Sequence, residues 1–276
     1  ESSRAFSLCI SEAIPSWVSM SRLIPIFFLF LSLLSADDLP KPVKPAPQGI
    51  VFKVAGGKAP MYLCGSIHLM QKQDFPLPEA YETAFKQSQR LVMEVPPEDM
   101  DPVAMQPVLM KYALLKEGSL EDQLEPATYK ALQAWAKEKE VPLAGLAKFQ
   151  PWLVAITITQ QAYEAFGMKA DRGIDVYFKN RLEQEKKTGS GLETMDDQFR
   201  LLSGFSLKIQ DQMILQSITE AKEADAELAK LLQAWRAGDT AAIAKTMEES
   251  FAEVPEVGKL LLQDRNARWV PKVKQL

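Results

Sequence analysis

The chain has 276 residues, enough for one large domain or two small ones, and its 47% hydrophobic and 25% charged residues are typical of a globular protein. The formal net charge of -4 at pH 7 gives no electrostatic reason to expect a nucleic-acid partner. The two cysteines, Cys9 and Cys64, are far apart in the sequence, so composition excludes a disulfide framework and a cluster of metal-binding thiolates.

The beginning of the chain predicts export. Residues 1–19 show no sustained periodicity, and we interpret them as a non-native segment upstream of a start at Met20. From Met20 to Ala36, Arg22 and the following apolar run have the layout of a signal peptide, and the run is too short for a membrane span. The protein is therefore expected in the periplasm or outside the cell.

Two outcomes stay open for this signal segment. Leu34 stands three residues before a cut after Ala36, where a small residue is preferred. Cleavage after Ala36 would release the protein, whereas an uncleaved segment would associate it with the membrane. Residues 37–48 contain four prolines and predict a linker.

The folded domain is expected to span residues 49–276 and to begin with a β-hairpin. Residues 50–54 and 61–64 form two short apolar runs with a pair of glycines between them. The only histidine, His68, follows the second run in Gly65-Ser-Ile-His68, so we expect its side chain at the end of a sheet. Two interpretations remain open: a functional group, or a structural residue bonded to a backbone carbonyl.

A helix over 77–89 and a strand over 91–95 are predicted next. Glu94 interrupts the apolar run of that strand. A carboxylate there is costly to bury unless it is paired, bound to a metal or placed at the end of the sheet. An edge strand whose Glu94 faces solvent is an equally good interpretation.

The rest of the chain predicts mainly helices, and the expected fold class is α/β, with a small mixed β-sheet flanked by many α-helices and a helix-rich second half. A short strand over 141–144, a solvated loop over 186–190 and a very short strand or turn over 191–194 are also expected. Asp175 follows Gly173 in the first turn of a predicted helix, where it either belongs to a site or stabilises the helix dipole. The predicted helices cover 103–115, 126–139, 151–166, 174–185, a segment from Met195, and 206 to the end with a break at 238–239.

Five sequence elements lie in order along residues 49–276: Gly65-Ser-Ile-His68, Leu91-Val-Met-Glu94, Gly173-Ile-Asp175, Gly191-Leu-Glu-Thr194 with Gln198, and Arg265-Asn266 with Trp269. In their order and spacing, these elements resemble the TraB/GumN family. The family is similar to the Tiki proteins, which are membrane-tethered, metal-dependent proteases that cleave the amino terminus of Wnt ligands. It also resembles a superfamily with erythromycin-esterase-like and haem-binding ChaN-like proteins.

The resemblance implies metal-dependent hydrolysis. His68 would be a metal ligand, and Glu94 would be a second ligand or the base that activates water. Imidazole and carboxylate suit manganese, cobalt, iron or zinc, and the residues do not distinguish these metals. Glu193 and Arg265 would join the catalytic group, and four further residues would surround the metal or orient the substrate. These four are Gly65, Ser66, Asp175 and Asn266, of which Asp175, like Glu193, is anionic enough to be a ligand itself.

The chain departs from the family pattern in one respect. The family has a second Gly-x-x-His motif beyond the Arg-Asn element, and this chain has a single histidine. Because Leu276 ends a helix-like run with no capping glycine, we expect the sequence to stop before that motif. The chain by itself would then lack half of the metal site.

The sequence therefore predicts an exported, metal-dependent hydrolase of a peptidase-like kind, acting on a peptide or small-molecule substrate. The alternative is a non-enzymatic envelope protein that binds a peptide or small ligand in the same pocket. A second Gly-x-x-His motif in the full-length gene would favour the enzyme, and a natural end at Leu276 would favour the binding protein.

Overall fold

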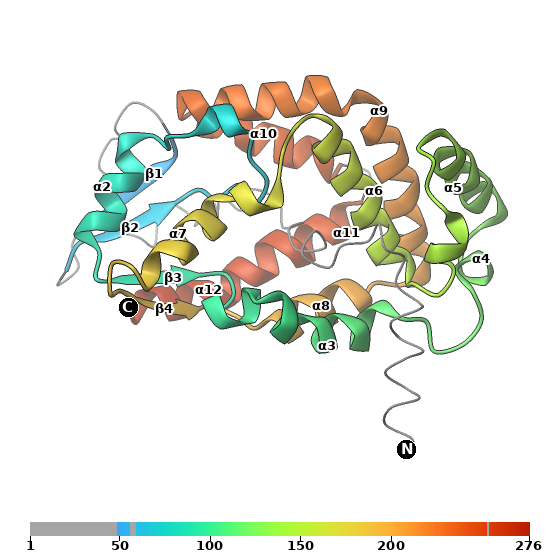
Figure 1. Cartoon of the computed structure of the whole chain (residues 1–276), viewed down its shortest axis with the longest axis horizontal. Coiled ribbons are helices and arrows are strands. Elements are labelled where there is room, and N and C mark those ends of the chain that lie inside the picture. The colour runs from blue at the N-terminus through green and yellow to red at the C-terminus, as the bar shows by residue number, and fades with distance from the viewer. Residues whose placement is uncertain (1–48, 56–58, 253) are drawn as a thin grey trace, which may run out of the picture. The chain divides into compact units, whose positions relative to one another are not determined.

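The computed structural model describes residues 49–55, 59–252 and 254–276 (Figure 1). The predicted non-native segment 1–19, signal segment 20–36 and linker 37–48 lie outside the described residues. Within the described part of the chain, no helix has the length and apolar character that crossing a membrane requires. Contacts divide this part into a strand unit (49–98, 163–194 and 223–276) and a helical unit (99–162 and 195–222).

The strand unit holds the four β-strands of the described chain. Two of them form the predicted hairpin, in which β1 (Val51–Val54) pairs antiparallel with β2 (Met61–Cys64). The other two, β3 (Arg90–Met93) and β4 (Thr188–Gly191), pair in parallel. The predicted helix-rich α/β fold is confirmed, and its strands form two two-stranded sheets, one antiparallel and one parallel.

Strand β4 shows that the predicted loop over 186–190 is wrong for 188–190, and the very short strand or turn expected over 191–194 is strand only at Gly191. Two glycines make the pairing possible. A Cβ added at Gly189 would overlap the ring of Pro97, and one at Gly191 would overlap the ring and the backbone nitrogen of Pro96. Glycine is rare in strands. The two glycines that allow this close approach are therefore also the reason that the sequence does not predict a strand here.

The helices of the strand unit include α2 (Glu79–Gln87), which the sequence predicts. Helix α9 (Leu207–Ala237) ends, also as predicted, before Gly238, whose φ of +69° is typical of a helix terminator. The unit further contains η2 (Lys72–Asp74), η5 (Ala170–Arg172), α7 (Ile174–Leu182), α10 (Thr240–Ser250), α11 (Pro255–Gly258), the π-helical turn η6 (Lys259–Gln263) and α12 (Asp264–Lys274).

Aromatic side chains form the core of the strand unit. Tyr81 and Phe85 lie one turn apart on α2 and therefore face the same way. The ring centroid of Tyr81 lies 6.5 Å from that of Phe178 on α7 and 6.0 Å from that of Trp235 on α9, and Phe85 lies 4.8 Å from Phe178. Burial of these rings packs α2, α7 and the end of α9 together.

The helical unit contains helices and turns but no β-strand among the residues that the structure describes. Its helix α3 lies beside α8 (Figure 1), and Asp196 of α8 accepts hydrogen bonds from Lys111 Nζ at 2.7 Å and from the Tyr112 hydroxyl at 2.9 Å. Prolines begin three of its helices, where a missing N–H costs nothing. The helices are α3 (Pro102–Ala113), α4 (Leu120–Gln123), α5 (Pro126–Glu138), α6 (Pro151–Ala165), α8 (Met195–Ser203) and the first part of α9; η3 (Pro97–Met100) precedes α3.

The strand predicted over 141–144 is wrong, because Leu143–Leu146 forms the 3-10 helix η4. Pro142 has no N–H to give to a strand partner, and its carbonyl accepts a hydrogen bond from Gly145 at 2.9 Å. The apolar run is therefore a turn whose Leu146 is buried.

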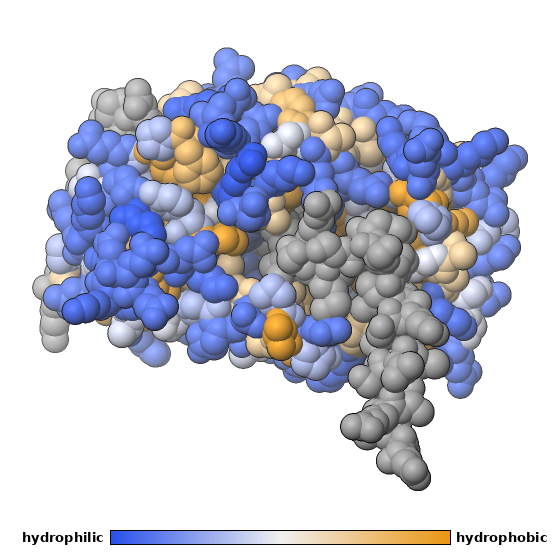
Figure 2. Space-filling model, viewed as in Figure 1, coloured by the Kyte–Doolittle hydropathy of each residue, from blue (hydrophilic) through white to orange (hydrophobic). Residues whose placement is uncertain are grey.

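Hydrophilic residues cover most of the face seen in Figure 2. Large hydrophobic side chains are exposed at only a few positions of the described chain, Val103, Leu207, Leu215 and Leu276. Scattered apolar residues of this kind are normal on a protein surface and form no contiguous patch by themselves.

Candidate functional site

Two of the predicted carboxylates lie at the carboxyl ends of the parallel strands. Glu94 follows β3 directly, and Glu193 comes two residues after β4. The strands run in the same direction, so both residues reach the same edge of the sheet. The backbone N–H of Glu193 donates to the carbonyl of Glu94 at 2.8 Å, which fixes the two residues beside each other.

Arg265 on α12 joins these two carboxylates. Its Nη2 donates to Glu94 Oε2 at 2.9 Å, and its Nε donates to Glu193 Oε1 at 3.1 Å. The arginine side chain is fully buried, while those of Glu94 and Glu193 are 19% and 8% exposed. The interpretation of Glu94 as a solvent-facing residue is therefore wrong, because its carboxylate is mostly buried and paired with a cation.

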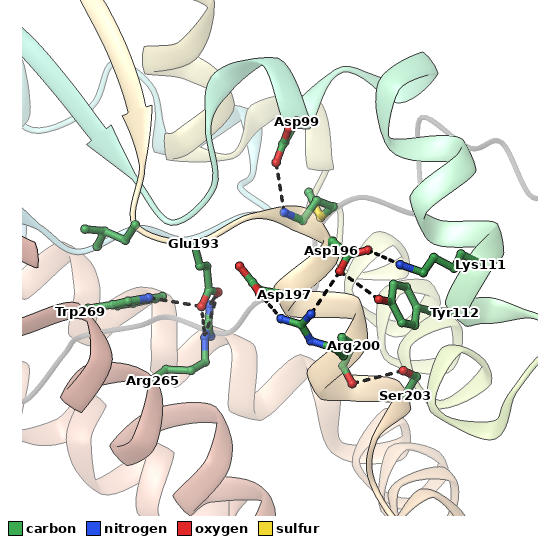
Figure 3. Close-up of polar contacts among 12 residues, drawn as sticks. Asp99, Lys111, Tyr112, Glu193, Asp196, Asp197, Arg200, Ser203, Arg265 and Trp269 are labelled. Atoms are coloured by element: carbon green, nitrogen blue, oxygen red, sulfur yellow. Dashed lines mark hydrogen bonds and ion pairs between the residues drawn. The ribbon is translucent and has the colours of Figure 1, made fainter.

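Trp269 completes the surroundings of Arg265. The two residues lie one turn apart on α12, with the guanidinium carbon 4.5 Å from the centroid of the tryptophan ring. The indole Nε1 also donates to Glu193 Oε2 at 3.3 Å, so Glu193 has partners on two sides (Figure 3). Aromatic stacking and a carboxylate together restrict the guanidinium to one orientation.

The π-helical turn η6 lies immediately before Arg265 and was not foreseen from the sequence. Its Leu261 supplies a carbonyl to Arg265 Nη1 at 3.4 Å. Wide turns of this kind are rare and are often found beside functional groups. The run Lys259–Gln263 has no proline or glycine that would signal an irregular helix.

His68 lies after β2 and pairs with Asp175 at the start of α7. Its Nδ1 is 3.0 Å from Asp175 Oδ2, with 11% of the histidine side chain and 16% of the aspartate side chain exposed. The Ile174 N–H donates to the Ile67 carbonyl at 3.0 Å, which attaches α7 to the turn that carries His68. The partner of the imidazole is thus a carboxylate and not the backbone carbonyl of the structural interpretation.

Gly173 allows α7 to approach His68 this closely. A Cβ at this position would overlap the backbone carbonyl of His68 and touch Asp175 Oδ1. The first turn of α7 therefore places Asp175 both near the helix dipole and against the imidazole, so the two roles considered for this residue are compatible.

The two pairs influence each other electrostatically. Burial lowers the pKa of His68, but the charge and hydrogen bond of Asp175, with the charge of Glu94, outweigh it and raise that pKa above 6.5. Burial raises the pKa of Glu94, and Glu193 adds to this increase, against the opposing charges of Arg265 and His68. The polar cluster is therefore one electrostatic group, which consists of His68, Glu94, Asp175, Glu193 and Arg265.

Four buried polar atoms in this region have no hydrogen-bond partner among the described residues. They are Ser66 Oγ, His68 Nε2, Asp175 Oδ1 and Asn266 Oδ1, and all belong to residues that the sequence singles out. Gly65, also singled out, instead uses its backbone, with its N–H donating to the Ile50 carbonyl at 2.8 Å. Because buried polar atoms are normally paired, such a concentration indicates a place where a ligand can bind.

The donors of the polar cluster fit part of a metal site. Asp175 holds Nδ1 of His68, as carboxylates in metalloproteins often hold the ring nitrogen that does not bind the metal, and this leaves Nε2 to face a metal. Glu94 is the other candidate donor. Among the described residues, however, no group of three or more histidine, cysteine, aspartate or glutamate side chains is arranged to hold a metal ion. The described chain thus offers fewer donors than a catalytic zinc commonly has.

Comparison with known proteins gives one match. A family model described as the TraB/PrgY/gumN family matches residues 50–276, which include every residue of the polar cluster. No curated protein and no solved structure matches the chain. Since the family model covers most of the sequence, the chain belongs to the TraB/PrgY/gumN family.

Proposed function

We propose that this protein is an exported hydrolase of peptides or small molecules, that its reaction centre is the polar cluster, and that it works with a divalent metal. The observation that carries the proposal is the buried Nε2 of His68. This nitrogen has no hydrogen-bond partner among the described residues, and the other ring nitrogen is held by Asp175. An imidazole fixed in this way is prepared to bind a metal or accept a proton.

Asp175 sets the tautomer of His68. When Nδ1 donates its proton to Asp175 Oδ2, the lone pair of neutral His68 lies on Nε2 and faces the site. The raised pKa of His68 works against this neutral form, because it keeps the ring protonated as an imidazolium up to a higher pH. The reactive neutral form should therefore increase as the pH rises through that pKa.

Glu94 is suited to move protons. Burial raises its pKa, so this carboxyl group exchanges a proton closer to neutral pH than an exposed glutamate does. Arg265 binds Oε2 of Glu94 and so orients this carboxylate. Because the arginine is fully buried and acts only through the carboxylates, we regard it as a positioning residue. Glu193, held by the arginine and by Trp269, keeps the guanidinium in place.

His68 would hold the metal through the imidazole Nε2. Arg265 already binds Oε2 of Glu94, so the other carboxylate oxygen would either ligate the metal or move a proton. When bound, a divalent metal supplies Lewis acidity toward a carbonyl group of the substrate. The residues of the chain would bind and orient that substrate through the unpaired oxygens of Ser66, Asp175 and Asn266.

The test compares His68→Ala and Glu94→Gln with the unchanged protein on a mixture of fluorogenic peptides with added manganese or zinc. Both variants should lose activity by about 10²- to 10⁴-fold, which is the usual contribution of a proton-transferring group. Asp196→Asn is the control, since it removes a half-buried carboxylate of the helical unit that does not belong to the polar cluster. Thermal melts measured in parallel should show a folded protein in every case. Full activity in both variants, or unfolding of His68→Ala, would refute the assignment.

The unpaired oxygens also favour a second candidate, a binding protein that captures a peptide or small ligand without cleaving it. Ser66 Oγ, Asp175 Oδ1 and Asn266 Oδ1 could all accept hydrogen bonds from such a ligand. Mass spectrometry of peptides incubated with the protein separates the two functions. New, shorter masses support the hydrolase, whereas retention of intact peptide that Asn266→Ala abolishes supports the binding protein.

A further inference from the structure

A buried hydrogen-bonded chain of two aromatic residues ends on the turn that carries His68. The Tyr81 hydroxyl donates to the Gly65 carbonyl at 2.6 Å, and it accepts from Trp235 Nε1 at 2.9 Å. Tyr81 is fully buried and Trp235 is 1% exposed. The three residues come from α2, α9 and the end of β2, all within the strand unit.

The tyrosine has little freedom to leave this position. A Cβ at Gly49 would lie 2.7 Å from its ring carbon Cε2, so the backbone of Gly49 packs directly on the ring. Burial also raises the pKa of the Tyr81 hydroxyl, which therefore remains a protonated donor at physiological pH. The Tyr81 hydroxyl accepts one hydrogen bond and donates another, so its position in the core is fixed.

The turn from Gly65 to His68 is held at each end by a different element. At its beginning, the Gly65 carbonyl is bonded to Tyr81, and at its end the Ile67 carbonyl accepts from Ile174 of α7. The imidazole of His68 must lie 3.0 Å from Asp175, which is on the same α7. Gly65 has two anchors that are independent of α7. Its N–H donates to the Ile50 carbonyl at 2.8 Å, and its carbonyl, which belongs to the peptide group leading into the turn, accepts from Tyr81.

We propose that Tyr81 is a positioning residue for His68: by holding the Gly65 carbonyl, it fixes the turn that presents the imidazole to Asp175 and to the site. Trp235 supports Tyr81 in the same task by orienting its hydroxyl. The inference deepens the proposed hydrolase function and rests on it for the effect on catalysis. Its effect on the geometry of His68 can be measured without any substrate.

The single histidine of the chain makes that measurement direct. In protein labelled with ¹⁵N in its imidazole, every histidine ring signal comes from His68, and the exchange of its Nδ1 proton with water reports the contact with Asp175. Tyr81→Phe removes the hydroxyl and keeps the ring. We expect this exchange to become about tenfold faster or more, and kcat to fall by about ten- to a hundredfold with KM nearly unchanged, because small misplacements of a reacting group are costly.

Thr128→Val is the matched control. It likewise removes one buried hydroxyl, which donates to Asp211 Oδ2 at 2.8 Å in the helical unit, and it should lower the melting temperature without changing the His68 signal. Trp235→Phe leaves the bond from Tyr81 to Gly65 and should show a smaller effect of the same sign. If Tyr81→Phe does not fold, the comparison of Trp235→Phe with Thr128→Val decides the question.

The inference is overturned if the exchange of the His68 proton is no faster in these aromatic variants than in Thr128→Val. Failure of the proposed function looks different: His68→Ala would then keep full activity while Tyr81→Phe still accelerates the exchange. Faster exchange of the His68 proton in Tyr81→Phe than in Thr128→Val, at a similar loss of melting temperature, would be the clearest support, since a purely structural role predicts equal exchange in the two variants.

Discussion

Arg265 combines two properties that rarely occur together, complete burial and a full positive charge. Removing one member of a buried ion pair lowers stability strongly, because the charges of its partners stay buried without compensation. In this site the partners are the carboxylates of Glu94 and Glu193, so truncation of the arginine leaves two like charges in the same interior. The stability of the strand unit should therefore be more sensitive to this residue than to any surface arginine.

We predict that Arg265→Met lowers the free energy of unfolding by about 3–5 kcal/mol at neutral pH, as for other buried ion pairs that lose one partner. Part of the lost free energy of unfolding should be regained at acidic pH. The pKa of Glu94 is raised even with Arg265 present, and without the arginine this carboxyl would be protonated at still higher pH, which relieves the repulsion. Urea denaturation at neutral and at mildly acidic pH measures both effects.

Arg200→Met is the control for this prediction, because Arg200 is 62% exposed and its ion pairs lie on the surface of α8. Its stability should hardly change at either pH. An equal loss in the two variants would show that the burial of Arg265 has no energetic consequence.

At the scale of elements, local signals explain most of what the sequence predicts correctly. The hairpin of β1 and β2, the proline-initiated helices and the break at Gly238 each depend on residues within one short window. Strand β4 and the π-helical turn η6 depend on packing against other elements and leave no such signal. The predicted residues of the site all lie in the strand unit, but the pair of Glu94 with Arg265 joins positions 171 residues apart and could not be derived from spacing.

We predict that Gly191→Ala separates the ends of β3 and β4 and weakens the placement of Glu193. The added Cβ would overlap the backbone of Pro96, which cannot move aside as a flexible side chain would. Overpacking of this kind costs about 1–3 kcal/mol. Thermal and urea unfolding of the variant give the magnitude, and activity on the peptide mixture should fall with it.

Ser190→Ala, one position earlier in β4, provides the comparison, since it adds no atom to the backbone contact. The prediction would be wrong if Gly191→Ala and Ser190→Ala were equally stable.

For the whole molecule, the number of metal donors is the decisive quantity. The described residues contain no group of three or more suitable side chains, and His68 with Glu94 gives two. We predict that calorimetric titration of the 276-residue chain with manganese or zinc shows weak binding, because an incomplete ligand set gives little free energy per metal. His68→Ala should remove even this weak signal. Tight binding of one ion would mean that the ligands have been assigned to the wrong residues.

The long separation between Glu94 and Arg265 also has a consequence during biosynthesis. The arginine follows the glutamate by 171 residues, so at a synthesis rate of about 5–20 residues per second it leaves the ribosome roughly 10–30 seconds later. Throughout that interval, the nascent chain carries a carboxylate whose eventual cation does not yet exist. Strand β3 must therefore remain open to solvent or retain a proton on Glu94, and the ion pairs of the polar cluster form only after α12 has been synthesised.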